Sequence, residues 1–161
     1  MPLRLAVISL VGALSGCAAV STIAPGSSTS DVTQRWGQPD RRDRSAAGER
    51  WIYTTLPEGR QVWRFDFDTG GRLLRQSQGL TLAQLSQIHD GMKQTAVEHE
   101  IGPSYWSLRY PYRPNELVHV YRFLADTIPM CFYVGYGDDG LVKSTGMQPE
   151  DRSNRSLHRP C

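Results

Sequence analysis

The sequence predicts an α+β fold built from two tandem units, each consisting of two helices followed by an antiparallel sheet, with the two units packed together. Three observations lead to this prediction: short helices with recognisable caps, strands that alternate apolar and polar residues, and an internal repeat of both. The first unit is placed at residues 26–80 and the second at 81–148. A signal peptide at 1–16 and a tether at 17–25 precede them, and a polar tail at 149–161 follows.

The internal repeat consists of two segments that share the same spacing of glycine and aliphatic residues. Ile23, Gly26, Val32 and Gly37 recur as Ile88, Gly91, Val97 and Gly102. Further along, the aromatic stretch 63–67 recurs at 132–136, so the distance between the two copies is slightly larger there. The larger offset predicts a small insertion in the second copy, which we place at 110–115, where two prolines interrupt the chain.

Hydroxyl residues mark where the helices begin. Ser28 has a carboxylate, Asp31, three residues further on, which is the spacing of a capping box. Thr81 and Gln84 have the same spacing ahead of an additional helix. Lys93 stands where the second copy should have its cap, so the start of that helix is less well defined. The hydroxyls near Ser28 are therefore interpreted as caps and not as a ligand loop.

The strand at 62–68 alternates strictly, with three aromatic residues on one face. Arg64, Asp66 and Asp68 occupy the other face, which we expect to be exposed to solvent. Glycine-containing turns at 68–71 and 137–140 predict hairpins.

The N-terminal segment indicates secretion and lipid attachment. One arginine precedes an apolar stretch at 5–14, which is too short to span a bilayer core of about 30 Å. The residues Leu14-Ser15-Gly16-Cys17 resemble the lipobox of bacterial lipoproteins, and an ordinary signal peptide is the alternative. The lipobox implies cleavage before Cys17 and attachment of a diacylglycerol to its sulfur, and Ala18 implies sorting to the outer membrane. No cofactor other than this covalent lipid is expected.

Two further cysteines, Cys131 and Cys161, would lie in a compartment that permits disulfides. One prediction is a bridge that ties the tail to a strand. The alternative is a buried, inert Cys131 with Cys161 on a mobile tail.

Composition and motifs indicate no enzymatic chemistry. The net charge of +2 does not favour nucleic-acid binding, and no small-molecule substrate is indicated. His89 and His99 lack a metal-ligand spacing and are expected to be solvated, while His119 is expected to be a hydrogen-bonded core or edge residue. The serines of the stretch 26–30 lack the local pattern of a nucleophile, and we predict neither catalytic nor metal-binding residues.

Aromatic and arginine residues gather between the second helix and the following strand. They are Tyr105, Trp106, Arg109, Tyr110, Tyr112 and Arg113. Because these residue types are enriched at interface hot spots, the segment is a candidate partner surface. The alternative is that half of these side chains cover the sheet and the others lie at its edge.

The order of motifs resembles the BamE (SmpA/OmlA) family of outer-membrane lipoproteins. The matching residues are Gly26, Val32, Gly37, Pro39, Trp51, Tyr53, Phe65, Phe67 and Gly71. The resemblance implies a small α+β domain that serves, without being an enzyme, as an accessory subunit of the machine that inserts β-barrel proteins into the outer membrane. This chain differs by carrying the unit twice, a layout similar to that of the β-lactamase inhibitor protein.

The expected function is therefore protein binding by a lipoprotein that is anchored in outer-membrane lipid and faces the periplasm. The expected partner is an envelope protein such as the barrel-assembly machine, with a role in barrel assembly or envelope integrity. The alternative is an inhibitor, or a periplasmic ligand-binding module.

Overall fold

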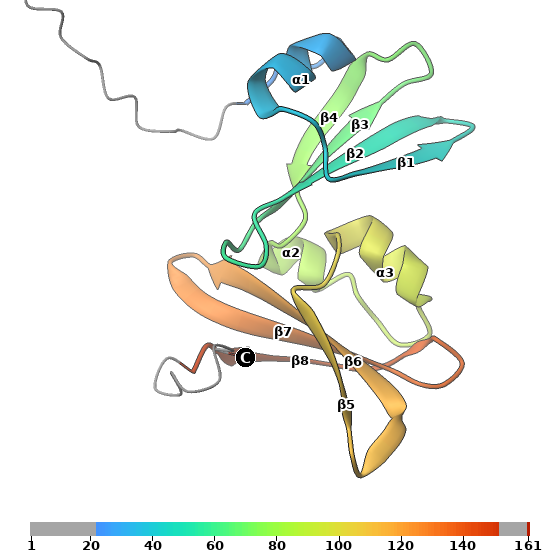
Figure 1. Cartoon of the computed structure of the whole chain (residues 1–161), viewed down its shortest axis with the longest axis vertical. Helices are drawn as coiled ribbons and strands as arrows, with labels where there is room; N and C mark the ends of the chain where they lie inside the picture. The colour runs from blue at the N-terminus through green and yellow to red at the C-terminus, as the bar shows by residue number, and fades with distance from the viewer. Residues whose placement is uncertain (1–21, 152–160) are drawn as a thin grey trace, which may run out of the picture.

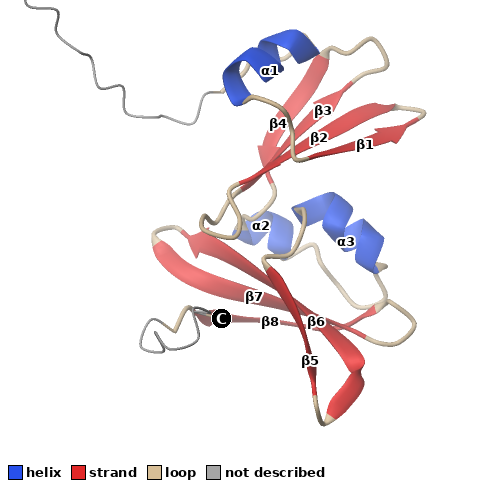
Figure 2. Cartoon of the chain, viewed as in Figure 1, coloured by secondary structure: helices blue, strands red, loops and turns tan. Residues whose placement is uncertain are grey.

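The computed structural model of the chain describes residues 22–151 and residue 161. The predicted signal peptide, Cys17 and part of the tether lie outside these residues. Two antiparallel sheets, each of four strands, dominate the described part (Figures 1 and 2). The elements are α1 (Thr29–Trp36), β1 (Arg41–Ser45), β2 (Gly48–Thr54), β3 (Val62–Phe67), β4 (Leu73–Gln78), α2 (Leu82–Leu85), α3 (Gln94–Ile101), β5 (Trp106–Tyr110), β6 (Arg113–Ala125), β7 (Ile128–Tyr136) and β8 (Val142–Pro149).

The predicted fold class, α+β with two helix-helix-sheet units, is wrong. Strands make up 48% of the structure and helices only 15%, so the fold is mainly antiparallel β. One reason is that sequence patterns missed β1, whose residues are almost all charged. A second reason is that one helix, α1, and not two, precedes the first sheet, while α2 has only four residues.

The helices and sheets are stacked in layers. Helix α1 covers one face of the first sheet, β1 to β4, and the short helices α2 and α3 lie between that sheet and the second one, β5 to β8 (Figure 1). In each sheet the strands are hydrogen-bonded in the order in which they occur along the chain. Strand Val62–Phe67 thus has helices on both of its faces.

The two segments that repeat in the sequence have the same local structure. Helices α1 and α3 each have eight residues. The glycines before and after them adopt the left-handed φ values that favour glycine, +87° at Gly26 and +83° at Gly91, then +77° at Gly37 and +90° at Gly102. At the predicted insertion the structure has the hairpin turn between β5 and β6.

Helix α1 begins and packs as its sequence predicts. The Ser28 hydroxyl accepts a hydrogen bond from the Asp31 backbone N–H at 3.2 Å, and the Asp31 carboxylate accepts one from the Ser28 N–H at 2.8 Å, which confirms the capping box. At the other end of the helix, the Tyr53 hydroxyl donates to the Gly37 carbonyl at 3.0 Å. Burial raises the pKa of Tyr53 to about 12, so this phenol stays a donor at neutral pH. The core beneath α1 consists of Ile23, Val32, Trp51, Tyr53, Phe65, Phe67 and Leu73.

The second core lies around α2 and α3 and joins the two sheets. Ile52 and Val62 of the first sheet are completely buried in the same cluster as Tyr121 and Val134 of the second. Its other buried members are Leu80, Leu85, Ile88, Val97, Ile101, Phe123, Phe132, Tyr136 and Val142. Because this core is shared, the sheets form one packed body.

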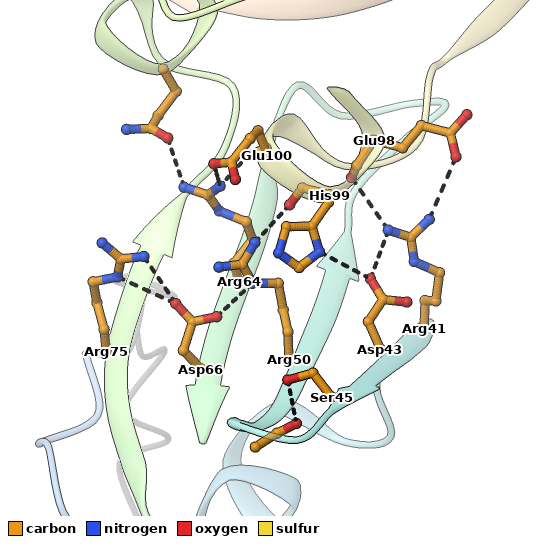
Figure 3. A network of polar contacts seen from close by, with 12 residues as sticks. Arg41, Asp43, Ser45, Arg50, Arg64, Asp66, Arg75, Glu98, His99 and Glu100 are labelled. Carbon is orange, nitrogen blue, oxygen red and sulfur yellow. Dashed lines mark hydrogen bonds and ion pairs between the residues drawn. The ribbon is translucent and has the colours of Figure 1, made fainter. Parts of the chain in front are cut away.

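A layer of ion pairs lies between the first sheet and α3 (Figure 3). Three arginines donate to successive carbonyls of the last turn of the helix: Arg41 to Glu98 at 3.3 Å, Arg50 to His99 at 2.8 Å, and Arg64 to Glu100. Cations at a helix C-terminus are favourable because the carbonyls there carry partial negative charge. The layer therefore fixes α3 on the sheet.

The expectation that Arg64 and Asp66 lie on an exposed face is wrong. The Arg64 side chain is 2% exposed, because α3 covers this face. Burial by itself would raise the pKa of Asp66, but hydrogen bonds from Arg50 and Arg75 outweigh it and hold the pKa below the ordinary value. Strand alternation identifies which residues share a face, but it does not show that a helix much further along the chain covers that face.

A second ion cluster and a disulfide lie at the other end of the sheets. The Glu150 carboxylate, 2% exposed, accepts hydrogen bonds from Arg60 of the β2–β3 loop and from Arg122 of β6. Cys131 of β7 is bonded to Cys161, with Cα atoms 5.8 Å apart. Cys131 itself is completely buried.

Candidate partner-binding surface

The second sheet buries one face and leaves much of the other open. On its inner face, alternate residues such as Tyr121, Phe132 and Val134 are buried against α2 and α3. On its outer face the register aligns Val118 with Gly135 and Gly135 with Ser144, and no helix lies on this side in Figure 1. An antiparallel sheet with one open face is the arrangement in which a surface is available to a partner.

A groove of about 290 Å³ runs along the outer face. It is lined by Tyr110, Glu116, Val118, Tyr133, Gly135, Ser144, Thr145, Gly146, Met147 and Gln148. Gly135 lies at the bottom of the groove, where a larger residue would clash with its neighbours. A Cβ there would lie 2.5 Å from the Ser144 hydroxyl and 2.7 Å from the Glu116 carboxylate. At Gly146 a Cβ would have no neighbour within 4 Å, so the groove is open above that residue.

Tyr133 forms one wall of the groove. Its hydroxyl accepts a hydrogen bond of 2.6 Å from the Gln148 amide, which fixes both side chains across β7 and β8. Burial raises the pKa of Tyr133, so the phenol is neutral at physiological pH. The wall is therefore an uncharged, preformed aromatic surface.

A second hollow of about 470 Å³ adjoins the groove through Glu116 and Ser144. Its other lining residues are Arg113, Pro114, Asn115, Gly137, Asp138 and Lys143. Arg113 pairs with Glu116 at 3.3 Å, so the rim of this hollow is polar.

The predicted partner segment forms the β5–β6 hairpin beside these hollows. Tyr112 at its tip is 97% exposed and Tyr110 is 47% exposed. Arg109 donates to the Pro114 carbonyl at 3.1 Å and thereby closes the hairpin. An exposed tyrosine next to a groove is a typical feature of protein interfaces.

The other two predicted residues lie at the far end of β5. Tyr105 is half-buried, its N–H donates to the Val120 carbonyl at 2.9 Å, and the Arg122 guanidinium lies 5.3 Å from its ring. Trp106 is also half-buried and is aligned with Val120. The structure thus divides the six candidates: Arg109, Tyr110, Tyr112 and Arg113 form the hairpin, whereas Tyr105 and Trp106 cover the sheet.

The histidines do not converge on a site. His89 and His99 are exposed, and His119 is 6% exposed, facing the shared core. The Nδ1 atom of His119 is 3.9 Å from the Glu98 carboxylate and has no hydrogen-bond partner, so the expected hydrogen bond is not formed at that atom. Among the described residues, no group of three or more histidine, cysteine or acidic side chains is placed to hold a metal ion.

The outer groove was missed in the sequence. Tyr133, Gly135 and Gly146 lie in the strands on either side of the predicted hairpin turn at 137–140, and strand alternation alone does not show which face of a sheet is left uncovered. The sequence of β8 does indicate an open face, because its residues after Val142 contain no large apolar side chain except Met147.

Within residues 22–151, no helix is long and apolar enough to span a membrane.

Comparison with known proteins does not assign a family. No family model and no curated protein matches the chain. A DUF4309 family protein, YjgB, from Bacillus subtilis shares 16% identity over 77% of this chain and 79% of its own, with a TM-score of 0.31. An extracellular protein containing an SCP domain from Bacillus anthracis shares 15% identity over 90% of this chain and 51% of its own, with a TM-score of 0.32. Both likenesses are too weak to indicate fold or function.

Proposed function

We propose that the protein is a lipid-anchored protein of the outer membrane, facing the periplasm, that acts by binding an envelope protein through the outer face of the second sheet. The observation that carries this proposal is the contrast between the faces of that sheet, one buried against helices and the other an open groove with a tyrosine hairpin beside it. A scaffold that holds aromatic side chains beside a preformed groove suits protein recognition. The barrel-assembly machine is the partner that the lipobox and the motif order favour.

The surface is tested by recovering partners from detergent-solubilised envelopes after brief chemical crosslinking. The wild type, the double variant Tyr110→Ala/Tyr112→Ala and the control Leu74→Ala are compared. Leu74 is 58% exposed on the first sheet, so it is matched to the tyrosines in exposure but not in location. We expect wild type and control to recover barrel-assembly subunits, and the double variant to recover about tenfold less, which corresponds to about 1.4 kcal/mol of binding.

Two outcomes would contradict the proposal. Recovery of a single soluble enzyme, again dependent on the tyrosines, would favour an inhibitor. Equal recovery by wild type and the double variant would exclude the hairpin as the binding surface.

The anchor is tested separately at Cys17. Two or more acyl chains are needed for stable anchoring, so Cys17→Ser should release the protein from the membrane fraction. Retention of this variant in washed outer membranes would contradict lipid anchoring.

A further inference from the structure

Strand β8 forms an open edge of the second sheet, and within residues 22–151 no strand pairs with its far side. Residues 143–149 are all exposed. Proteins commonly block such edges with charges or keep them short, because the free N–H and C=O groups pair readily with another strand. The edge strand β1 follows this rule, having five residues of which four are charged. Strand β8 has eight residues and one charge, Lys143, near one end.

The ladder shows which backbone groups of β8 are free. The Glu150 N–H donates to the Pro129 carbonyl at 3.0 Å, so these two residues form a hydrogen-bonded pair. Because such pairs alternate along an antiparallel ladder, Gln148 and Gly146 also bond to β7. Thr145 and Met147 then direct their N–H and C=O groups away from the sheet. Pro149 fits this pattern, since its missing N–H would have pointed outward.

The groove lies beside this edge, and Gly146 is among its lining residues. Within the described part of the chain, no heavy atom lies within 4 Å of where the Cβ of a larger residue at this position would stand. A residue of an added strand that stands opposite Gly146 would place its side chain beside Gly146, on the face of the sheet that carries Tyr133 on the neighbouring strand β7. Aromatic side chains stabilise sheets when they pack across from a glycine. On the other face, the added strand would lie beside Thr145 and Met147, and Met147 is 42% exposed.

We propose that β8 binds its partner by strand addition. The occupant is an extended segment of another protein with an aromatic residue opposite Gly146 and aliphatic residues beside Met147. This inference rests on the proposed function and specifies its binding mode. A second copy of the chain fits less well, because antiparallel pairing of Thr145 with Met147 of the other copy sets Gly146 against Gly146 and leaves the groove unfilled.

The test uses a ten-residue synthetic peptide of alternating valine and threonine, with one central threonine replaced by phenylalanine and a lysine at each end. Affinity is measured by fluorescence anisotropy, and backbone N–H exchange is measured residue by residue with and without peptide. We expect binding to slow exchange at Thr145 and Met147 at least tenfold, with much smaller changes at Gly146 and Gln148, which already bond to β7.

Two matched pairs complete the design. The variant Thr145→Pro removes one outward N–H and should weaken the peptide at least tenfold, whereas Thr145→Val keeps the N–H and should bind within twofold of wild type. Replacing the phenylalanine of the peptide by alanine should weaken binding at least fivefold. The exchange measurement on the wild type still tests the proposal if the proline variant fails to fold.

Several results would overturn the proposal. These are failure of the peptide to bind at millimolar concentration, binding without slower exchange at Thr145 and Met147, or equal affinity of Thr145→Pro and Thr145→Val. Slow exchange that depends on protein concentration in the absence of peptide would show that a second copy occupies the edge. If the tyrosine variant loses the envelope partner while Thr145→Pro retains it, the proposed function stands and strand addition is refuted.

Discussion

The two sheets have the same number of strands and the same strand order, but they differ in what covers them. The first sheet has α1 on one face and α3 with its ion layer on the other. In the part of the chain that the structure describes, the second sheet has helices on one face, and its other face carries the groove with the tyrosine hairpin beside it. Similar strand patterns therefore serve two purposes: the first sheet packs against helices on both faces, and the second presents a surface. Because α3 covers one face of the first sheet, Arg41 and Arg64 on that face pair with Glu98 and Glu100 of the helix.

The largest effect is expected from breaking the ion layer of the first sheet. Arg64→Ala removes a guanidinium that is 2% exposed and leaves the Glu100 carbonyl and the Gln84 amide without their donor. We expect a loss of about 3–5 kcal/mol in the free energy of unfolding, measured by urea denaturation. The control is Arg75→Ala, since Arg75 pairs with Asp66 but is 62% exposed, and it should cost less than about 1 kcal/mol. Equal losses in the two variants would contradict burial of Arg64.

Removing the disulfide tests the second sheet. The bond between Cys131 and Cys161 closes a loop across a sequence separation of 30 residues. Cys161→Ser should lower the free energy of unfolding by about 2–4 kcal/mol. Thermal unfolding of the oxidised wild type and the variant would show the difference. Free thiols found in the unreduced, denatured wild type would contradict the bridge.

The shared core between the sheets should respond to pH through His119. Burial lowers the pKa of His119, and the nearby Glu98 only partly offsets this. The unfolded chain then binds the proton more tightly, so stability is lost as the pH falls from about 6.5 towards the folded pKa. His119→Gln should remove this part of the pH dependence. Identical pH profiles for wild type and His119→Gln would contradict the burial of a neutral imidazole.

The smallest effect on stability is expected at the hairpin. Tyr112 is 97% exposed and Tyr110 is 47% exposed, so replacing both by alanine should change the free energy of unfolding by less than about 0.5 kcal/mol. A change above about 1 kcal/mol in urea denaturation would show that these side chains support the fold and would weaken their use as a test of binding.

Local features of the fold were predictable because neighbouring residues determine them. The capping box at Ser28, the turn glycines Gly71 and Gly140, and the aromatic strand 63–67 all follow from short-range chemistry. The fold class was not predictable in the same way. It depends on β1, whose charged residues pair with a helix that is distant in the sequence.

The candidate surface was predicted only in part. The hairpin residues Tyr110 and Tyr112 could be predicted from residue type, since aromatic and arginine side chains are enriched at interface hot spots. The groove beside them depends on Gly135 and Gly146, where the missing side chain matters only because of what packs opposite. The open face of the sheet follows from the packing of the whole chain.

The most direct measurement of the central claim compares the two sheets in living cells. A photoreactive amino acid is placed either at Tyr112 beside the second sheet or at Leu74 on the first sheet, both of which are exposed. If the second sheet is the binding surface, irradiation should link one and the same envelope protein to the Tyr112 probe in repeated experiments and should leave the Leu74 probe unlinked. Equal linkage at both positions, or linkage at Leu74 alone, would contradict the assignment of the second sheet as the binding surface.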